Sequence, residues 1–390
     1  MKTGKVVIGA NYGDEGKGLL TDYFASHDPD NSLVVRFNGG AQAGHTVVTP
    51  DGRRHVFSHF GSGTFVGAPT FLSKFFIVNP LIFVKEYADL RRLRLAPQII
   101  IDQNAMMTTP FDMLINQTVE IGRGAKRHGS CGLGINETVT RSLRAPEFRV
   151  NSSDAMNPAL LRWRLMHLKD QWLATRIREL RLDLSCEHAK KFLNNLDFIL
   201  DEYIKDTQSL LTLASITNFY PNAKNVIFEG AQGLMLDEDR IDQFPHVTRS
   251  KTGLTNVMHL APHFEIEKLD VTYVTRTYLT RHGAGPLEHE SEWSFPDLTN
   301  IPNQFQGTLR FAPLNLDVLE KNIQIDLLRA RNKFGGMSSI SADNISAGVA
   351  MTCVDQVPAP STRNLFLPVH YMSYGPTRRC VHPALTAAMR

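Results

Sequence analysis

Short apolar runs rich in Val, Ile and Phe recur along this chain, and glycine-rich turns follow many of their carboxyl ends. Several of these runs lack polar alternation, which is typical of strands buried on both faces in a parallel sheet. Open α/β sheets bind their ligands at turns of this kind. The pattern therefore predicts an α/β fold with a large, mostly parallel central sheet flanked by helices. The runs are residues 5–10, 33–37, 75–79, 98–102, 225–230, 271–280 and 347–355.

Residues 154–218 depart from this pattern, because they carry Leu and Trp at helical spacing, few glycines and the single Pro158. Such spacing predicts two or three helices, inserted between two halves of the sheet. Further helices are expected over about 16–25 and 315–331. No repeat or low-complexity linker divides the chain, so residues 1–390 are predicted to form one domain with a helical insertion at about 154–218.

Composition and charge exclude several classes of protein. The net charge of +3 is too small and too scattered to indicate a nucleic-acid partner. No apolar stretch reaches the ~18 residues of a membrane span, and the N-terminus opens with a strand pattern rather than a signal peptide. The four cysteines form no CxxC pair, which argues against a zinc site and for a reducing compartment. We therefore expect a cytoplasmic protein with no membrane or nucleic-acid partner.

The first loop, GANYGDEGKG at residues 9–18, follows a predicted strand and opens a predicted helix. Backbone N–H groups and the positive helix end form an anion site there, and Lys17 adds a positive charge. The loop is not a Walker A motif, because Gly18 stands where Ser or Thr would bind magnesium. Asp14 and Glu15 lie in the same loop, although carboxylates repel phosphate. A plain glycine-rich turn is the alternative interpretation.

The second loop, FNGGAQAGHTVV at residues 37–48, also follows a predicted strand. Its glycines leave the backbone open to a ligand, and His45 and Thr46 come directly after them. An isolated His is more often structural or exposed, but this one lies in a glycine-rich turn beyond a strand end. The position favours a catalytic role for His45.

Two later loops have the same character. Residues 123–134, RGAKRHGSCGLG, combine basic residues with Ser130 and Cys131, which suits phosphate oxygens, although a solvated basic turn fits equally well. Nothing in the sequence places a base beside Cys131, so it is a weak candidate nucleophile. In FEGAQGLMLD, residues 228–237, Gln232 can offer an amide donor and acceptor to the edge of a base.

Three further segments complete the set. TRHGAGP at residues 280–286 and SYGPT at residues 373–377 add rigid turns at predicted strand ends. Six loops of this kind, with residues 244–253 counted as a continuation of the fourth loop, imply a large polar cleft with several ligands. In FPHVTRSKTG, residues 244–253, the candidate phosphate or hydroxyl contacts are Thr248, Ser250 and Thr252.

These loops together resemble those of the adenylosuccinate synthetase family, and they occur in that family's order: GDEGKG, NGGAQAGHT, RGAK…GSCGLG, FEGAQG…LD, VTRSKTG, TRHGAGP and SYGPTR. The resemblance spans nearly the whole chain and is least distinctive over residues 154–218. It implies a fold related to the P-loop NTPases. It also implies a ligase that joins L-aspartate to C6 of a purine nucleotide through a 6-phosphoryl intermediate, using a nucleoside triphosphate and Mg²⁺.

The resemblance gives the first two loops catalytic roles. Asp14 would remove the N1 proton of the purine so that O6 can attack the γ-phosphate. The same carboxylate and the Gly44 carbonyl would bind Mg²⁺, which cancels the repulsion between acid and phosphate. His45 would stabilise the charge on O6 and later act as an acid as phosphate leaves. Lys17 and Gly16 would hold the phosphoryl group in transfer.

Other residues follow from the motifs by the same resemblance. The implied catalytic set is Asp14, Lys17, His45 and Gln232. The residues implied to bind the phosphoryl donor are Gly13, Glu15, Gly16, Lys17, Gly18, Gly44, Thr46, Asp343, Gly375 and Pro376. Those implied to bind the purine nucleotide are Asp14, Asn38, Ser130, Cys131, Arg141, Gln232, Thr248 and Thr252. Thr308 and Arg310 would bind the aspartate carboxylates. Arg141 would reach the nucleotide of a partner subunit, which makes a homodimer functional.

Two segments depart from the family pattern. The aspartate loop is usually rich in arginine, but it reads GTLRFAPLN at residues 307–315 and contains only Arg310. The donor-base site usually has a Lys two residues before an Asp that reads guanine. SISADN at residues 339–344 offers Asp343, with Ser341 at the Lys position. Because this Lys is absent, GTP is less strongly indicated as the phosphoryl donor, and ATP or dATP is favoured.

This compact, divergent pattern resembles the phage branch of the family, which converts dGMP, L-aspartate and ATP into 2-amino-2′-deoxy-N6-succinyladenylate for 2-aminoadenine DNA. Guanine also carries N1–H and O6, so the chemistry is unchanged. For a phage protein the expected location is the host cytoplasm. The alternatives are a synthetase that uses IMP and GTP in AMP biosynthesis, a nucleotide-binding switch, and a kinase with no aspartate requirement.

Overall fold

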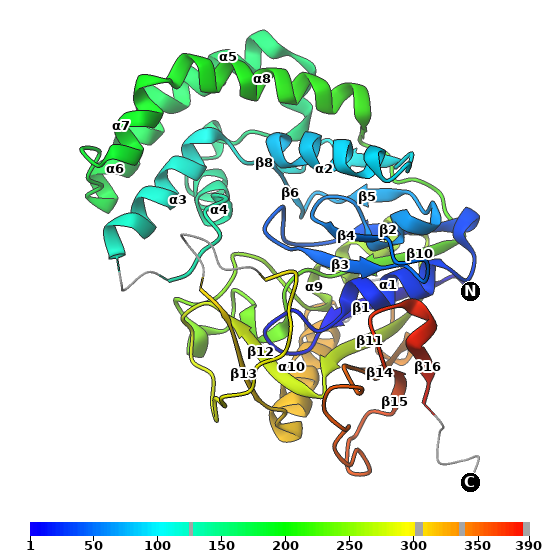
Figure 1. Cartoon of the computed structure of the whole chain (residues 1–390). Coiled ribbons are helices and arrows are strands. Elements are labelled where there is room, and N and C mark those ends of the chain that lie inside the picture. The colour runs from blue at the N-terminus through cyan, green and yellow to red at the C-terminus, as the bar shows by residue number, and fades with distance from the viewer. Residues whose placement is uncertain (125–127, 301–306, 335–339, 385–390) are drawn as a thin grey trace.

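The computed structural model describes residues 1–124, 128–300, 307–334 and 340–384. Over these residues one central sheet contains ten strands, and all neighbouring pairs in it are parallel except β15 with β16 (Figure 1). The predicted α/β class with a large, mostly parallel central sheet is confirmed. In spatial order the strands are β16 (Val381–Pro383), β15 (Val369–Ser373), β14 (Ile345–Thr352), β11 (Lys268–Arg276), β1 (Thr3–Gly9), β10 (Asn225–Glu229), β2 (Ser32–Arg36), β5 (Thr70–Leu72), β7 (Ile99–Asp102) and β9 (Ser215–Thr217).

Smaller two-stranded sheets and a set of helices surround the central sheet. The small sheets pair β3 (His45–Val48) with β4 (Arg54–Phe57), β6 (Ile77–Val78) with β8 (Met106–Met107), and β12 (Tyr278–His282) with β13 (Leu309–Pro313). The helices are α1 (Lys17–Ala25), α2 (Pro80–Arg92), α3 (Pro110–Arg123), α4 (Ile135–Arg144), α5 (Pro158–His167), α6 (Ala174–Leu180), α7 (Glu187–Asn194), α8 (Leu196–Leu213), α9 (Leu254–Leu260) and α10 (Leu316–Phe334).

Strand β1 shows how the two faces of the sheet acquire different helices. Successive side chains of a strand point to opposite faces. Val6 and Ile8 belong to a core that includes α9 and α10, whereas Val7 belongs to a core that includes α1. All three side chains are fully buried, as expected for a parallel sheet covered on both sides.

Two predicted strands differ from the observed ones. The run at 75–79 forms only the short β6, which pairs with β8 outside the central sheet, and the nearby central strand is β5. The run at 271–280 divides at Thr277 into β11 and β12, which belong to different sheets. An apolar run indicates that a segment is buried. Which strand it pairs with is decided by residues distant in sequence.

The helices expected at residues 154–218 are present, but they lie beside one edge of the central sheet. Residues 154–218, all of which are described, form four helices, α5 to α8, and end in the edge strand β9, so they do not separate two halves of the sheet. In Figure 1 these helices form an outer layer beyond α2 and α3. Their buried side chains share one core with β5, β7 and α3; examples are Leu161, Leu165, Leu200 and Tyr203.

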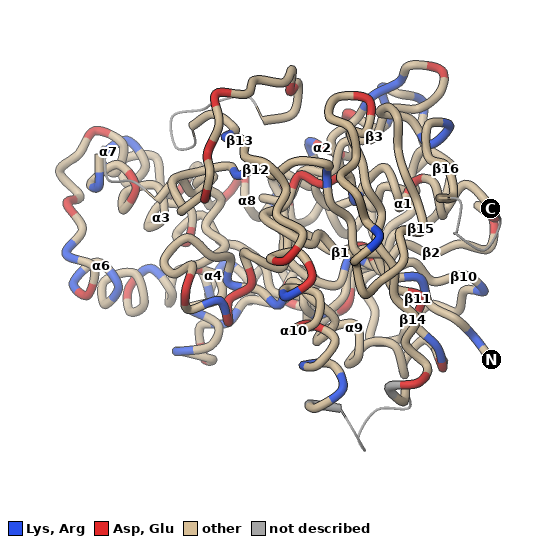
Figure 2. Tube along the Cα trace, turned by 90° about the horizontal axis from the view of Figure 1, so that it is seen from below, with Lys and Arg blue, Asp and Glu red and all other residues tan. Residues whose placement is uncertain are grey.

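The charged residues show no segregation by sign along the chain. Figure 2 shows Lys and Arg interspersed with Asp and Glu, in keeping with the small net charge of +3. Among the described helices, none combines the length and the apolar character that a membrane crossing requires.

Candidate active site

The loops after β1, β2, β10 and β14 meet at the carboxyl edge of the central sheet, because these strands are parallel. Asn38, after β2, exchanges two hydrogen bonds with the backbone of Ala231, after β10, at 2.7 and 3.0 Å. The Met235 N–H donates to the Asn11 carbonyl at 2.9 Å. The first, second and fourth predicted loops therefore form one site. Asn38 is fully buried and joins the loops, a bracing role that the sequence did not predict.

Glu15 explains why an acid lies beside the lysine of a phosphate-binding loop. Its buried carboxylate accepts hydrogen bonds from the N–H groups of Asn11 at 2.8 Å and Gly13 at 3.0 Å. Its second oxygen lies 2.9 Å from Lys17 Nζ, which is also buried. The Thr352 hydroxyl donates to the Glu15 carbonyl at 2.7 Å. Glu15 therefore shapes the loop and balances the charge of Lys17.

Glycines allow the start of α1 to pack against the second loop. Gly16 is the N-cap residue, with a left-handed φ of 100°. A Cβ on Gly18 would lie 3.0 Å from the Thr46 carbonyl oxygen and 3.1 Å from His45 Cβ. A Ser or Thr at this position of a Walker A motif would therefore require the second loop to shift by a few tenths of an ångström. The Thr46 hydroxyl lies 2.6 Å from that of Thr299.

Asp14 holds a half-buried carboxylate that makes no hydrogen bond to any residue the structure describes. Its backbone lies in the left-handed region at φ 60°, which Asp tolerates, and its carbonyl accepts a hydrogen bond from Arg276 Nε at 2.5 Å. The side chain is therefore available to a ligand.

The predicted magnesium ligands, the Asp14 carboxylate and the Gly44 carbonyl directly before β3, are of the kind that Mg²⁺ prefers. Within the described residues there is no cluster of three or more His, Cys, Asp or Glu that could hold a metal. The protein would therefore supply part of the coordination and leave the rest to phosphate oxygens and water, as is usual for Mg²⁺.

His45 is held by Glu229, the last residue of β10. Its Nδ1 lies 2.7 Å from Glu229 Oε1, and the same carboxylate accepts hydrogen bonds from the Ser62 N–H at 3.0 Å and from the Ser62 hydroxyl. Because the carboxylate accepts a hydrogen bond from Nδ1–H, Nε2 is the acceptor nitrogen of the neutral ring. Nε2 is buried and has no partner among the described residues. A buried acceptor without a partner at this edge marks a position for a ligand.

The protonation state of His45 follows from its surroundings. Burial, together with the charges of Arg36 and Lys17, lowers the pKa of His45 from 6.5 to about 4, although Glu229 opposes this shift. Without ligand the imidazole is therefore neutral at pH 7. Its predicted role as an acid requires the negative charge of a bound ligand to raise this pKa. Arg36 is fully buried, and its Nε and one terminal nitrogen lack partners among the described residues.

Sequence reasoning missed three residues of this arrangement, namely Glu229, Ser62 and Arg36. Glu229 and Arg36 each end a largely apolar strand, and a charge in that place is the signal that could have identified them. Ser62 gave no signal, because it lies 167 positions from Glu229 in the sequence.

Gln232 of the fourth loop is available to a ligand, whereas Thr252 of the 244–253 segment is engaged within the chain. Gln232 is half-buried at φ 65°, and its amide makes no hydrogen bond to the described residues. Thr252 is buried and donates through its N–H and hydroxyl to Asp237 at 2.7 and 3.2 Å. Of the two threonines predicted to contact phosphate, the half-buried Thr248 is therefore the better placed.

The third loop packs against two other predicted loops. A Cβ on Gly129 would lie 3.2 Å from Gly283 Cα in the TRHGAGP segment. The rings of His128 and His246 lie 5.3 Å apart. The third loop therefore packs against both the TRHGAGP turn and the 244–253 segment.

The polar side chains of the third loop differ in their contacts and in their burial. The Ser130 hydroxyl accepts a hydrogen bond from Asn116 Nδ2 at 2.9 Å. Burial raises the pKa of the Cys131 thiol, which disfavours the thiolate and a nucleophilic role. The basic residues Lys126 and Arg127 lie outside the described residues.

Arg141 does not lie where the resemblance implied. It is fully buried on α4, with its Nε and one terminal nitrogen 2.9 and 2.7 Å from the Asp112 carboxylate, and it also donates to two backbone carbonyls. These contacts use its guanidinium within the chain, so the prediction that Arg141 reaches a partner's nucleotide is corrected. On the same helix Arg144 is 54% exposed and pairs with Glu179 at 2.9 Å.

Asp343 lies at the opposite edge of the sheet from the loops. It precedes β14, and the eight residues of that strand separate its ends by roughly 26 Å. Its assignment to the donor base is therefore wrong, because the sequence match did not show which strand end it flanks. Asp355 follows the carboxyl end of β14, is exposed, and lies two residues after Cys353. This spacing is the one that the family pattern gives to Lys and Asp.

Gly375 and Pro376 lie near this turn. The Val354 N–H donates to the Ser373 carbonyl at 3.1 Å, so the ends of β14 and β15 stay together. Thr377 forms a parallel bridge with Val48 of β3. The 373–377 turn therefore adjoins the strand that begins at His45.

The two predicted aspartate-binding residues lie on the β12–β13 hairpin. Thr308 is exposed, and Arg310 donates to Glu290 at 2.7 Å and to a nearby backbone carbonyl at 2.8 Å. The buried Arg281 of the same hairpin lies 4.4 Å from the centre of the Tyr12 ring. This contact connects the hairpin to the first loop.

Comparison with known sequences identifies a family. The adenylosuccinate synthetase family matches residues 6–309. The adenylosuccinate synthetase of Chlorobium chlorochromatii is 30% identical over 294 residues, which cover 73% of this chain and 64% of that protein. The Thermoplasma acidophilum adenylosuccinate synthetase is 30% identical over 328 residues, covering 82% and 72%. The chain thus spans less than two thirds of the length of the first relative.

Solved structures share the fold at low sequence identity. Fully ligated adenylosuccinate synthetase from Plasmodium falciparum superposes with a TM-score of 0.71 at 16% identity, covering 98% of this chain and 99% of that one. Cyanophage S-2L succinoaminodeoxyadenylate synthetase, bound to dGMP and to dATP as an energy donor, gives a TM-score of 0.60 at 16% identity and covers 100% and 97%. At this identity the likeness concerns the fold.

Proposed function

The chain belongs to the adenylosuccinate synthetase family, and from that premise we propose that it joins L-aspartate to C6 of a purine nucleotide. The proposed substrates are dGMP and ATP or dATP, and the product is 2-amino-2′-deoxy-N6-succinyladenylate for 2-aminoadenine DNA. One observation carries the ligase chemistry. An available Asp14 carboxylate lies on the loop that packs against His45, whose buried Nε2 has no partner among the described residues.

In the first step, Asp14 takes the N1 proton of the purine while O6 attacks the γ-phosphorus and the nucleoside diphosphate leaves. Lys17 and the backbone N–H groups of the first loop hold the oxygens of the transferred group. His45 faces the reacting oxygen through Nε2, and Gln232 contacts the purine. When bound at Asp14 and Gly44, Mg²⁺ supplies positive charge that offsets the repulsion between carboxylate and phosphate.

In the second step, the amine of aspartate attacks C6 and loses a proton while the C6–O6 bond breaks, so phosphate leaves carrying O6. The charge of the phosphoryl group raises the pKa of His45, so the imidazole can hold a proton and pass it to the departing phosphate. Glu229 stabilises the imidazolium that this step requires, since its carboxylate accepts from Nδ1 at 2.7 Å. Thr308 and Arg310 are proposed to bind the aspartate carboxylates.

Asp355 replaces Asp343 in the proposed donor-base site. A carboxylate can accept hydrogen bonds from the amino group of adenine as well as from N1–H and N2–H of guanine. Cys353 stands where the family pattern has Lys, which supports ATP or dATP over GTP. The S-2L structure, which holds dGMP and dATP, supports the same choice by analogy of fold.

A second candidate is the ordinary family reaction, in which IMP and GTP are used to make adenylosuccinate. It is favoured by the 30% identity to adenylosuccinate synthetases. For either reaction we propose a homodimer in the cytoplasm, of the host if the protein is phage-encoded, with a residue other than Arg141 crossing between subunits.

The choice between the two reactions can be tested with purified protein. We expect aspartate-dependent phosphate release, and a product with the mass of the succinylated nucleotide, from dGMP with ATP or dATP. The rate should exceed that with IMP and GTP by roughly tenfold or more, since a buried hydrogen-bonding group can discriminate to that degree. Turnover with IMP and GTP alone would overturn the dGMP assignment. Phosphate release without aspartate would indicate a kinase or a nucleotide-binding switch.

A further inference from the structure

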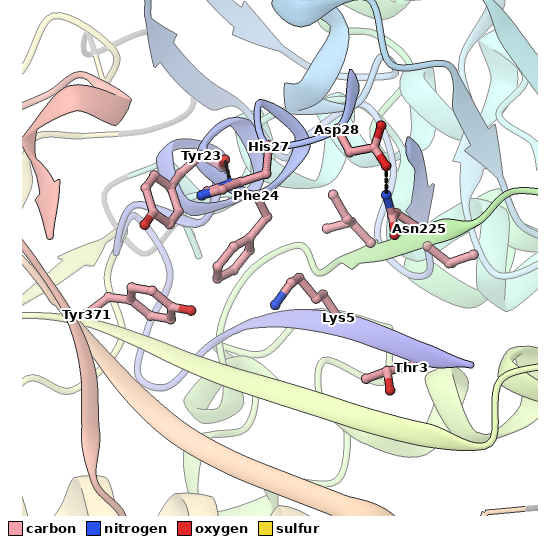
Figure 3. Close-up of a pocket in the computed structure, with 10 residues that line it drawn as sticks. Thr3, Lys5, Tyr23, Phe24, His27, Asp28, Asn225 and Tyr371 are labelled. Carbon is pink, nitrogen blue, oxygen red and sulfur yellow. Dashed lines mark hydrogen bonds between the residues drawn. The ribbon is translucent and has the colours of Figure 1, made fainter. Parts of the chain in front are cut away.

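A cavity of about 500 Å³, here called the far-edge cavity, lies at the amino edge of the central sheet (Figure 3). Its walls come from the starts of β1 and β10, the end of α1, and Tyr371 of β15. The loops of the candidate active site lie at the carboxyl ends of these same strands. Strand β1 is seven residues long, roughly 20 Å, so the two sites are separate.

Aromatic rings form one side of the far-edge cavity. The Tyr371 ring lies 5.3 Å from the Phe24 ring and 5.7 Å from the Tyr23 ring, in edge-to-face arrangements. The His27 ring lies 4.7 Å from that of Tyr23, also edge to face. Tyr23 and Tyr371 are half-buried, so part of each ring is open to an occupant. Such rings offer contact area to another planar ring.

The charged side chains of the cavity are already paired. Lys5 Nζ lies 2.9 Å from Asp270 and 4.7 Å from the centre of the Phe24 ring. The Asp28 carboxylate accepts a hydrogen bond from Asn225 at 2.9 Å and lies 3.8 Å from the Lys224 ammonium. The walls therefore present hydrogen-bonding groups without a net charge that would call for a charged ligand.

We propose that the far-edge cavity binds an uncharged, planar heteroaromatic molecule of nucleoside size. The volume lies within the range of small-molecule sites, and such sites combine apolar and aromatic walls with a few polar groups. A heteroaromatic ring packs on the open parts of Tyr23 and Tyr371, and its acceptor atoms meet Lys5 and the tyrosine hydroxyls. A phosphate finds no cation free of a carboxylate partner among the groups named here.

The test is calorimetric titration of the whole chain with adenosine and, separately, with AMP. Thr3 is exposed at the start of β1 and lines the cavity, so Thr3→Trp fills the space without altering the core. Thr212→Trp makes the same change at an exposed position of α8 outside the cavity and serves as the matched control. Tyr371→Ala removes a ring, and Tyr371→Phe keeps it.

We expect Thr3→Trp and Tyr371→Ala to weaken adenosine binding by roughly tenfold or more, while Thr212→Trp and Tyr371→Phe bind as the native chain does. AMP should bind this site no more tightly than adenosine. Equal adenosine affinity in the native chain and Thr3→Trp would overturn the proposal. So would a lack of adenosine binding to the native chain at millimolar concentration. Tighter binding of AMP that is lost in Thr3→Trp would replace the uncharged ligand class with a phosphate-bearing one.

Discussion

Glu15 Oε2 and Lys17 Nζ lie 2.9 Å apart inside the first loop, and both side chains are only 3% exposed. The lysine that is expected to hold a transferred phosphoryl group therefore already has a partner in the same loop. Removing either partner of a buried pair leaves the other charge uncompensated, and that loss is larger than the net contribution of the pair.

Glu15→Gln should lower the free energy of unfolding by about 3 kcal/mol, because Lys17 loses its counter-charge and the backbone N–H groups of Asn11 and Gly13 lose a strong acceptor. Urea denaturation measures the change. Glu202→Gln breaks an exposed pair with Lys205 and should cost less than about 1 kcal/mol. Equal losses in the two variants would contradict the bracing role of Glu15.

Asp14→Asn should leave nucleotide affinity largely intact and lower kcat by ~10²-fold or more, the usual effect of removing a general base. The amide keeps the shape of the side chain but cannot take the N1 proton. Calorimetry with dGMP and steady-state kinetics separate binding from turnover. Asp30→Asn, at an exposed residue beyond α1, is the control. Unchanged turnover in Asp14→Asn would rule out the proposed base.

His45 should make stability depend on pH below neutrality. Its pKa falls from 6.5 to about 4 on folding, so between these values the unfolded chain binds the extra proton, and stability is lost as pH falls from 6.5 towards 4. The loss due to this group should approach about 3 kcal/mol. Asp22 and Asp326, whose pKa values burial raises to about 6, act with the opposite sign. Comparing denaturation of the native chain and His45→Gln at each pH isolates the contribution of His45. A pH-independent difference would contradict it.

Arg141→Ala should destabilise the chain by about 3–5 kcal/mol with or without nucleotide, since it leaves the Asp112 carboxylate buried and unpaired. The double variant Arg141→Met with Asp112→Leu should recover part of this loss, because it removes both charges. Arg144→Ala, at an exposed pair, should cost less than about 1 kcal/mol of stability. If Arg141→Ala unfolds like the native chain but loses nucleotide affinity, Arg141 serves the ligand after all.

Much of the fold could be predicted because it depends on local pattern. Uninterrupted Val and Ile in β1 require burial on both faces, and the glycine-rich loop after it requires the start of a helix. The same loops supplied the family resemblance, and they meet at one edge simply because the strands are parallel.

The predictions that differ from the structure concern which residue a side chain contacts, or which end of a strand a residue lies beside. Arg141 is buried against Asp112, Thr252 is bound to Asp237, and Asp343 flanks the amino end of β14, so none of the three has the surroundings that its motif implied. The residue type was correct in each case, but its neighbours were unknown.

The sequence by itself determined the class of fold, the glycine-rich loops and the acid and base candidates Asp14 and His45, because backbone preference and hydrophobic pattern act over a few residues. Only the tertiary structure decided that Glu229 holds His45 from 184 positions away and that its carboxylate leaves Nε2 as an acceptor. Contacts of that range depend on how strands are ordered in the sheet, and no local pattern in the sequence records that order.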